Sequence, residues 1–288
     1  MGMRTILITG INGFLGSHLA KKLSKNYKIV GLEYSVKNLF RLKDYSFKVY
    51  SSGDETDTIF KENEIFAIIH SATVYRRITD PIENLILTNI LLPVKLYELA
   101  NSFNVTLFLN TDSFFNNEKY EYSFLSEYTL SKKHVLDWLK TVKGDCKLIN
   151  MKLFHMYGPD DSPDKFIPGI ISKLKNGDPS IDITLGEQLR DFIYISDVVS
   201  AYRLVLQNSS LMKKFIEFEV GTGKETSIKD IILQIKESIK SRTKLNFGAL
   251  NYRPNEIMKS KANIKALCDL GWEPQITIEE GIKLMENV

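Results

Sequence analysis

Short apolar runs alternate with amphipathic stretches through the first half of the chain. Several apolar runs are continuous in Ile, Val, Leu and Phe, which is typical of strands buried on both faces of a parallel sheet. The runs that predict strands are 5–9, 28–32, 47–50, 66–70, 106–110 and 147–154. Helical periodicity lies between them, at 14–25, 55–63, 81–102 and 124–143. This alternation predicts an α/β fold with a Rossmann-type, doubly wound parallel sheet.

The pattern changes after residue 154. Residues 157–168 and 175–180 are rich in turn-forming residues. Beyond them the periodicity predicts one strand and three further helices, at 215–220, 197–208, 227–240 and 277–286. We therefore expect a dinucleotide-binding domain over 1–154 and a smaller mixed lobe over 155–288, some segments of which return to the first domain. Ligands of open α/β folds bind at the carboxyl ends of the strands, so the second lobe is expected to bind substrate there.

Composition excludes several classes of function. The net charge is only +3 and the charges are scattered, so no dense basic block points to a nucleic-acid partner. No apolar run approaches the length of a membrane span, and the N-terminus has no signal-peptide core. Cys146 and Cys268 show no CxxC spacing, which argues against disulfides and a metal site. We expect a cytoplasmic protein, with Trp138 and Trp272 in its core.

Three glycines follow the first strand directly, in the stretch ILITGINGFLG over residues 6–16. Gly10, Gly13 and Gly16 suit a tight turn, a close approach of a pyrophosphate and close packing of the next helix. Alone, the stretch is also consistent with a plain strand–turn–helix junction, although the pyrophosphate loop is favoured. Glu33, at the end of the second strand, stands where an acidic acceptor for a ribose hydroxyl is expected. Its carboxylate favours NAD, whereas Arg41 and its neighbour Lys37 leave NADP open.

A tyrosine and a lysine share one face of the helix predicted around residues 127–139. Tyr128 and Lys132 are four residues apart, and a nearby ammonium is expected to lower the pKa of a phenol toward the range of an acid–base catalyst. The alternative is a partly buried tyrosine beside a solvated lysine. Just before this helix, Thr111, Asp112 and Ser113 end a strand. The Thr111 hydroxyl suits the orientation of a substrate carbonyl, although such a triplet also forms turns readily.

The TGxxGxxG stretch, the strand-end threonine and the YxxxK pair, in this order, resemble the extended short-chain dehydrogenase/reductase family of nucleotide-sugar epimerases, dehydratases and reductases. Residues 68–74, 151–161 and 190–202 resemble further elements of that family. The resemblance implies Thr111, Tyr128 and Lys132 as catalytic residues. It also implies a nicotinamide cofactor, NAD(P), bound by Gly10, Asn12, Gly13, Phe14, Leu15, Gly16, Glu33, Asp54, Ser71, Ala72, Thr73, Asn89, Tyr128, Lys132 and Phe154.

The same resemblance implies a nucleotide-diphosphate sugar as the substrate. Arg190 and Arg253 are expected on its diphosphate, since guanidinium groups bind phosphate through two parallel hydrogen bonds. The other residues expected near the substrate are Tyr75, Asp112, Ser113 and His155. For His155, the sequence leaves ligand contact and a turn-capping role equally open. A homodimer through the helices at 81–102 and 124–143 is implied as well.

Within the family, residues 152–171 and 183–199 are most similar to CDP-abequose and CDP-paratose synthases. This predicts reduction of a 4-keto-6-deoxy sugar in deoxysugar biosynthesis for surface polysaccharides. Ser113 stands where sugar dehydratases carry a catalytic Glu, which argues against dehydration. A C4 epimerase with tightly bound NAD is the alternative. A reductase would consume NADPH, and Glu33 fits NADPH poorly, whereas an epimerase keeps NAD bound. A non-catalytic sensor of the nicotinamide ratio would have no need of Tyr128, Lys132 and Thr111.

Overall fold

The computed structural model describes residues 2–52, 56–75, 80–117 and 125–286. The chain divides into two compact units. The first consists mainly of Met1–Asn116, Leu125–Lys152 and Ala201–Phe218, and the second mainly of Leu153–Ser200 and Glu219–Val288. Helix α7 (Ile195–Gln207) runs from the second unit into the first.

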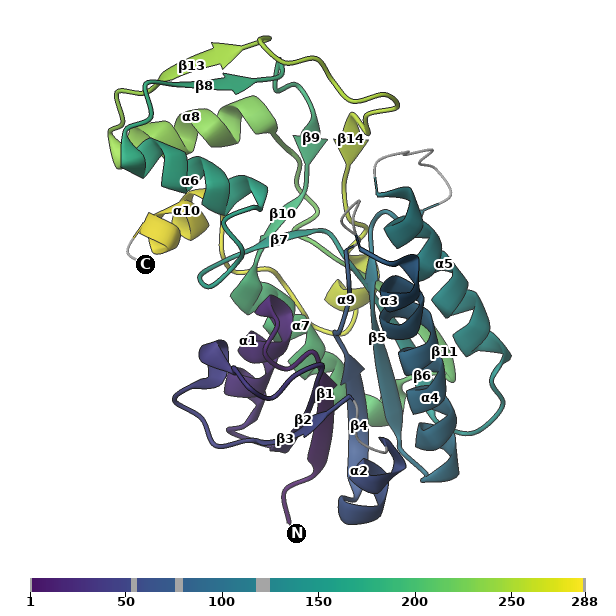
Figure 1. The fold of residues 1–288 in the computed structure, drawn as a ribbon. Coiled ribbons are helices and arrows are strands. Elements are labelled where there is room, and N and C mark those ends of the chain that lie inside the picture. Colours follow the sequence, from purple (N-terminus) through teal and green to yellow (C-terminus); the bar gives the residue numbers. More distant parts are fainter. Residues whose placement is uncertain (1, 53–55, 76–79, 118–124, 287–288) are drawn as a thin grey trace. The chain divides into compact units, whose positions relative to one another are not determined.

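A seven-stranded sheet organises the first unit (Figure 1). Its spatial order is β11-β6-β5-β4-β1-β2-β3, and β1 pairs in parallel with both β2 and β4. The order reverses between β1 and β4, the point at which doubly wound sheets bind ligands. The predicted Rossmann-type sheet is thus confirmed. Its strands are β1 (Thr5–Thr9), β2 (Lys28–Glu33), β3 (Lys48–Ser51), β4 (Ile65–His70), β5 (Leu107–Ser113), β6 (Lys147–Leu153) and β11 (Phe215–Val220).

Helices connect these strands and form a core with the sheet. Leu7, Ile68 and Phe108 of the sheet are fully buried and belong to one core with Leu96 and Val135 of the covering helices. The one helix predicted over 81–102 is instead three consecutive segments. The helical elements of this unit are α1 (Phe14–Leu23), η1 (Phe40–Leu42), α2 (Thr56–Glu62), α3 (Ile82–Ile86), the π-helical turn η2 (Leu87–Leu91), α4 (Leu92–Ser102), α5 (Ser126–Thr141) and η3 (Ser209–Leu211).

The second unit mixes short strands with helices (Figure 1). Strand β7 pairs with β10, β8 pairs with β13, and β9 lies between β12 and β14. The elements are β7 (His155–Tyr157), α6 (Phe166–Asn176), β8 (Ser180–Ile183), β9 (Leu189–Arg190), β10 (Phe192–Tyr194), β12 (Thr226–Ser227), α8 (Ile228–Ile239), β13 (Lys244–Phe247), β14 (Lys259–Ser260), α9 (Lys265–Cys268) and α10 (Ile278–Glu286).

Helix α6 and Trp138 also differ from the sequence predictions. Helix α6 begins inside the stretch predicted as turn, because Pro168 lies in its first turn, where a missing N–H removes no intrahelical bond. Trp272 is buried as predicted, and its indole N–H donates to Ser200 Oγ at 2.8 Å. The prediction for Trp138 was wrong, because this side chain is 58% exposed on α5 while Leu136 and Leu139 are buried. Across the described residues, every helix is too short or too polar to cross a membrane.

Candidate active site

The loop between β1 and α1 has no space for a side chain at Gly10 or Gly16. Gly10 has φ +62°, and a Cβ on it would lie 2.8 Å from Ala72 Cα. A Cβ on Gly16 would overlap the Gly10 carbonyl oxygen. Helix α1 starts at Gly13 without a side-chain cap and without an acidic residue in its first turn. Its first N–H groups therefore suit an anion, and the loop fits the pyrophosphate of a dinucleotide.

Two opposite charges meet at Asn12 in this loop. Glu33 Oε2 accepts from the Asn12 backbone N–H at 2.9 Å, and Glu33 Oε1 accepts from the Tyr34 N–H at 3.0 Å. The Arg41 side chain donates to the Asn12 carbonyl oxygen at 3.1 Å, and its backbone N–H donates to Asn12 Oδ1 at 3.1 Å. The acidic residue predicted at the ribose side thus lies at the glycine loop, with a guanidinium nearby.

The segment after β4 is tied to β1 and to the next helices. Ser71 Oγ donates to the Thr9 carbonyl oxygen at 2.7 Å, and the Ala72 N–H donates to Thr9 Oγ1 at 3.1 Å. Asn89, buried in the π turn, accepts from the Val74 N–H at 2.8 Å and donates to the Val74 carbonyl oxygen and to Ser131 Oγ at 3.0 Å each. Asn89 Oδ1 also accepts from the Thr73 hydroxyl at 3.4 Å. The predicted cofactor-lining residues 71–73 are therefore held by β1 and Asn89.

The structure brings Thr111, Tyr128 and Lys132 together. All three are buried, and Lys132 Nζ donates to the Thr111 carbonyl oxygen at 2.8 Å and lies 5.7 Å from the centre of the Tyr128 ring. Burial lowers the pKa of Lys132 to about 8, against the opposing charge of Asp112. The Thr111 hydroxyl lies 2.8 Å from the hydroxyl of Tyr202.

The expected direction of the Tyr128 pKa was wrong for this structure. Burial raises the pKa of the Tyr128 phenol well above its ordinary value, and the nearby Tyr75 and Asp112 raise it further. Desolvation disfavours tyrosinate more strongly here than the lysine favours it. The predicted substrate residue Tyr75 stacks on Tyr128, with ring centres 4.4 Å apart and an interplanar angle of 24°.

Asp112 and Ser113 extend the buried group along β5. The Ser113 N–H donates to Asp112 Oδ1 at 2.7 Å, while the side-chain amides of Asn116 and Asn150 donate to Asp112 Oδ2 at 2.9 and 2.8 Å. Sequence reasoning missed Asn150 and Tyr202. The available signal for Asn150 was a polar residue at alternate positions of an otherwise apolar strand, since Asn150 and Lys152 share a face of β6.

The second unit holds the remaining predicted residues. Phe154 is buried and its N–H donates to the Val220 carbonyl oxygen at 3.0 Å. His155 lies 5.3 Å from the Phe192 ring, and burial, followed by the Arg190 charge, lowers the pKa of His155 to about 3. Arg190 forms a buried ion pair with Glu256 at 2.6 Å. Glu256 also connects to Arg253, because its N–H donates to the Arg253 carbonyl oxygen at 3.2 Å.

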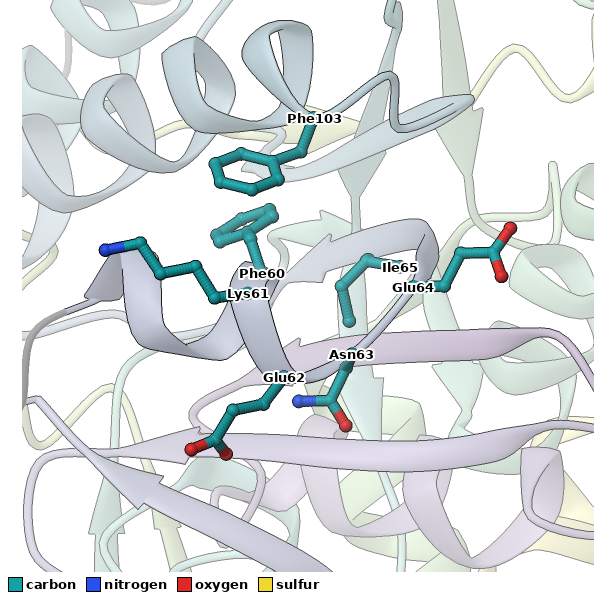
Figure 2. Close-up of a pocket in the computed structure, with 7 residues that line it drawn as sticks. All are labelled: Phe60, Lys61, Glu62, Asn63, Glu64, Ile65 and Phe103. Atoms are coloured by element: carbon teal, nitrogen blue, oxygen red, sulfur yellow. The ribbon is translucent and has the colours of Figure 1, made fainter.

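Two features lie apart from these groups. Asp54, predicted on the adenine side of the cofactor, lies outside the described residues. A cavity of about 330 Å³ lies at the junction of α2 and β4 (Figure 2). Its walls include Phe60 and Phe103, whose ring centres are 5.3 Å apart, and none of the predicted site residues lines it. This cavity gives no support to a ligand site.

The strand order, the glycine cradle and the buried Tyr–Lys pair define a Rossmann-type dinucleotide-binding protein of the short-chain dehydrogenase/reductase kind. The chain belongs to the NAD dependent epimerase/dehydratase family, whose model matches residues 6–221. It is 34% identical to the CDP-abequose synthase of Salmonella typhimurium, over 96% of both chains. It is 37% identical to the CDP-abequose synthase of Salmonella muenchen, over 98% of this chain and 97% of that one.

Solved structures share the fold at lower identity. The UDP-glucose 4-epimerase of Thermotoga maritima, solved with UDP-glucose, aligns with a TM-score of 0.83 at 22% identity over 98% of this chain and 97% of its own. The UDP-glucose 4-epimerase of Thermus thermophilus, solved with NAD, aligns with a TM-score of 0.81 at 18% identity over 98% of each chain. Both likenesses concern the fold.

Proposed function

We propose that the chain is a cytoplasmic NAD(P)-dependent reductase of a 4-keto-6-deoxy sugar linked to a nucleotide diphosphate, acting in deoxysugar biosynthesis. The observation that carries the proposal is the buried group of Thr111, Tyr128 and Lys132. Thr111 lies on β5, a strand of the same sheet whose first strand, β1, leads into the glycine loop. Similarity over nearly the whole chain to two CDP-abequose synthases supports a CDP-linked sugar. Ser113 in place of a second carboxylate supports reduction over dehydration.

The cofactor would be held by the first unit. The Gly10–Gly16 loop and the first turn of α1 would bind its pyrophosphate, and Glu33 would accept from its ribose. A nicotinamide cofactor supplies a hydride for the carbonyl carbon when it is bound. Glu33 favours NAD, while Arg41 and the reductive direction of the reaction favour NADPH.

The protein's own residues would manage the proton and the orientation of the sugar. Tyr128 would donate its phenolic proton to the carbonyl oxygen, and Thr111 Oγ1 would orient that oxygen by hydrogen bonding. Lys132 would stabilise the tyrosinate left after proton transfer, since an opposite charge nearby favours the ionised form. Water or a solvent-connected group would then reprotonate Tyr128.

Substrate binding is proposed mainly for residues 155–288, with dinucleotide binding proposed for 1–154. Arg190 and Arg253 would bind the diphosphate, and the Arg190–Glu256 ion pair keeps the first guanidinium ordered in the second unit. Tyr75, Asp112, Ser113 and His155 are the residues proposed to border the sugar, and a homodimer is proposed as the assembly.

Turnover measurements test this function. Purified protein is mixed with NADPH or NADH and CDP-, dTDP- or UDP-linked 4-keto-6-deoxyglucose, and nicotinamide absorbance is followed. Tyr128→Phe is expected to lower kcat by about 10²–10⁴-fold, because it removes the proton donor, while cofactor affinity is retained. Tyr97→Phe is the matched control, since this buried phenol donates to the Cys146 carbonyl oxygen at 2.9 Å within α4's packing. Absence of turnover with every nucleotide would refute the reductase.

A C4 epimerase with tightly bound NAD is the second candidate, and Glu33 is the observation that favours it. A carboxylate whose two oxygens are fixed by backbone N–H groups at the glycine loop suits lasting retention of NAD. This function predicts that NAD co-purifies with the protein. It also predicts interconversion of sugars without net change in nicotinamide absorbance.

A further inference from the structure

Asp112 is buried inside the first unit and is surrounded by hydrogen-bond donors. The carboxylate is buried, and its hydrogen-bond partners among the described residues all donate N–H groups: Ser113 to Oδ1, and Asn116 and Asn150 to Oδ2. An ionised carboxylate only accepts hydrogen bonds, whereas a protonated one must also donate. This set of partners therefore suits the charged form.

The orientation of Asn150 follows from its other neighbour. Its side-chain nitrogen also donates to Glu217 Oε2 at 2.7 Å, and Glu217 Oε1 forms an ion pair with Lys152 at 2.8 Å. Because the ion pair keeps Glu217 charged, Asn150 must present its NH₂ group to it. The same nitrogen then donates to Asp112, and Asn150 Oδ1 accepts from Asn110 at 2.8 Å.

The carboxylate lies next to the acid–base pair. Asp112 follows Thr111, whose carbonyl oxygen accepts from Lys132, and the Asp112 charge acts on both Lys132 and Tyr128. Among the described residues, the other titratable groups that act on these three are His70 on Lys132, Tyr75 on Tyr128 and Tyr202 on Asp112. Burial raises the pKa of Asp112, and the amide of Asn150 and the charge of Lys132 oppose that rise.

We propose that Asp112 is a positioning residue: a fixed buried anion that keeps Lys132 as an ammonium and Tyr128 as a neutral phenol. Both effects have one sign, since a negative charge favours the protonated form of each neighbour. The site is thereby set to give a proton to a carbonyl oxygen, the direction that reduction requires. The inference rests on the proposed reductase function and adds this role to the sugar contact proposed for Asp112.

Lysine NMR on the full chain tests the charge effect without any turnover. With ¹³Cε-lysine labelling, the Lys132 signal is assigned by its loss in Lys132→Met and titrated with and without NADPH. Asp112→Asn is expected to lower the pKa of Lys132 by about one pH unit relative to wild type. Asp230→Asn, which removes a charge from an exposed residue of α8 outside this network, is the control and is expected to leave the Lys132 titration unchanged. An unchanged Lys132 titration in Asp112→Asn overturns the proposal.

Turnover gives a second readout and separates failure of the proposed Asp112 role from failure of the proposed reductase function. In Asp112→Asn the alkaline limb of the reduction rate is expected to move to lower pH by about one unit, because Tyr128 then loses its proton more readily. A uniform fall in kcat with an unmoved limb would mean a merely structural role and overturns the proposal. If wild type shows no turnover, the reductase fails while the Lys132 titration still decides the role of Asp112.

Folding of the variant is controlled separately. Should Asp112→Asn not fold, Asn116→Ala removes one donor from Asp112 Oδ2 and keeps the residue itself. The variant makes the ionised form of Asp112 less stable. It is expected to move the Lys132 titration in the same direction as Asp112→Asn, by a smaller amount. No movement in this folded variant overturns the proposal.

Discussion

At the scale of single residues, the Glu33 and Arg41 charges at Asn12 are expected to act in opposite directions on the choice between NAD and NADP. The Glu33 carboxylate repels the extra 2′-phosphate of NADP, whereas the Arg41 guanidinium attracts it. We expect Glu33→Gln to shift the ratio of dissociation constants toward NADPH by about tenfold, and Arg41→Gln to shift it toward NADH by a similar factor, about 1.4 kcal/mol each.

Titration calorimetry or fluorescence with both reduced cofactors measures these ratios. Arg4→Gln is the matched control, because this arginine lies over the Phe66 ring at 4.5 Å rather than at the glycine loop. Equal effects of the Arg41 variant on NADH and NADPH would contradict a role in recognising the 2′-phosphate.

His70 makes folding stability depend on pH. Burial, followed by the Lys132 charge, lowers the pKa of His70 from 6.5 to about 3, and its Nδ1 lies 2.9 Å from Thr9 Oγ1. Between these values the unfolded chain binds a proton that the native state does not. Stability is therefore full above pH 6.5 and falls by about 1.4 kcal/mol per pH unit for this histidine as pH drops toward 3.

Urea unfolding at several pH values between 7 and 4.5 measures that slope. We expect His70→Gln to lower the free energy of unfolding at pH 7. We also expect it to reduce the slope of that free energy against pH by about 1.4 kcal/mol per pH unit, the contribution of one proton. The exposed His134, replaced by Gln, serves as the control and should leave the slope unchanged. A His70→Gln slope equal to that of wild type would contradict the neutral, buried histidine.

Spacing along the chain predicted the loop, strand end or helix on which each candidate site residue lies. It did not predict the residues that surround them. Gly10, Glu33, Tyr128 and Lys132 follow from local motifs, and the structure places each on the expected loop, strand end or helix. The partners from distant segments, such as Asn150 and Glu217, depend on which strands become neighbours. The raised pKa of Tyr128 depends on burial, which no motif reports.

At the scale of elements, long periodic segments were predicted well and local irregularities were not. The seven strands of the large sheet lie within a few residues of the apolar runs, because burial on both faces leaves a continuous signal. The π turn at Leu87–Leu91 was missed. Pro93, at the start of α4, has no N–H to donate to the carbonyl of Asn89, so the regular helical ladder is interrupted there.

Asn89 shows what the π turn contributes. Its amide joins the segment after β4 to α5 through Val74 and Ser131. We expect Asn89→Ala to lower the free energy of unfolding by about 2–3 kcal/mol, because the partly buried backbone groups of Val74 and the buried Ser131 hydroxyl lose this partner, and to weaken cofactor binding. Asn208→Ala is the control, since this amide donates only to the Leu204 carbonyl oxygen among its described contacts and should cost about 1 kcal/mol or less. Denaturant unfolding separates the two.

At the scale of the whole molecule, exposed apolar side chains on the helices of the first unit bear on the proposed assembly. Helix α5 packs beside the π turn and α4. On these elements and α3, several large apolar side chains are exposed: Ile82, Ile86, Leu87, Leu91, Leu130 and Trp138. Contiguous exposed apolar surface marks interaction sites, and a closed two-fold dimer lets such a surface cover itself. The misplaced prediction for Trp138 becomes intelligible if a second copy buries it.

The proposed homodimer is expected to depend on Leu91 and Trp138, whose side chains are 52% and 58% exposed in the single chain. The double variant Leu91→Glu, Trp138→Glu should shift the protein from dimer to monomer in analytical ultracentrifugation, because two like charges per copy would have to be buried in the interface. Leu211→Glu is the control: Leu211 is 68% exposed but lies on η3, so this variant should stay dimeric. Because the proposed catalytic residues Tyr128 and Lys132 also lie on α5, the monomer should lose turnover as well as affinity between copies. A wild-type protein that sediments as a monomer at micromolar concentration would contradict the dimer, and an unchanged mass for the double variant would place the interface elsewhere.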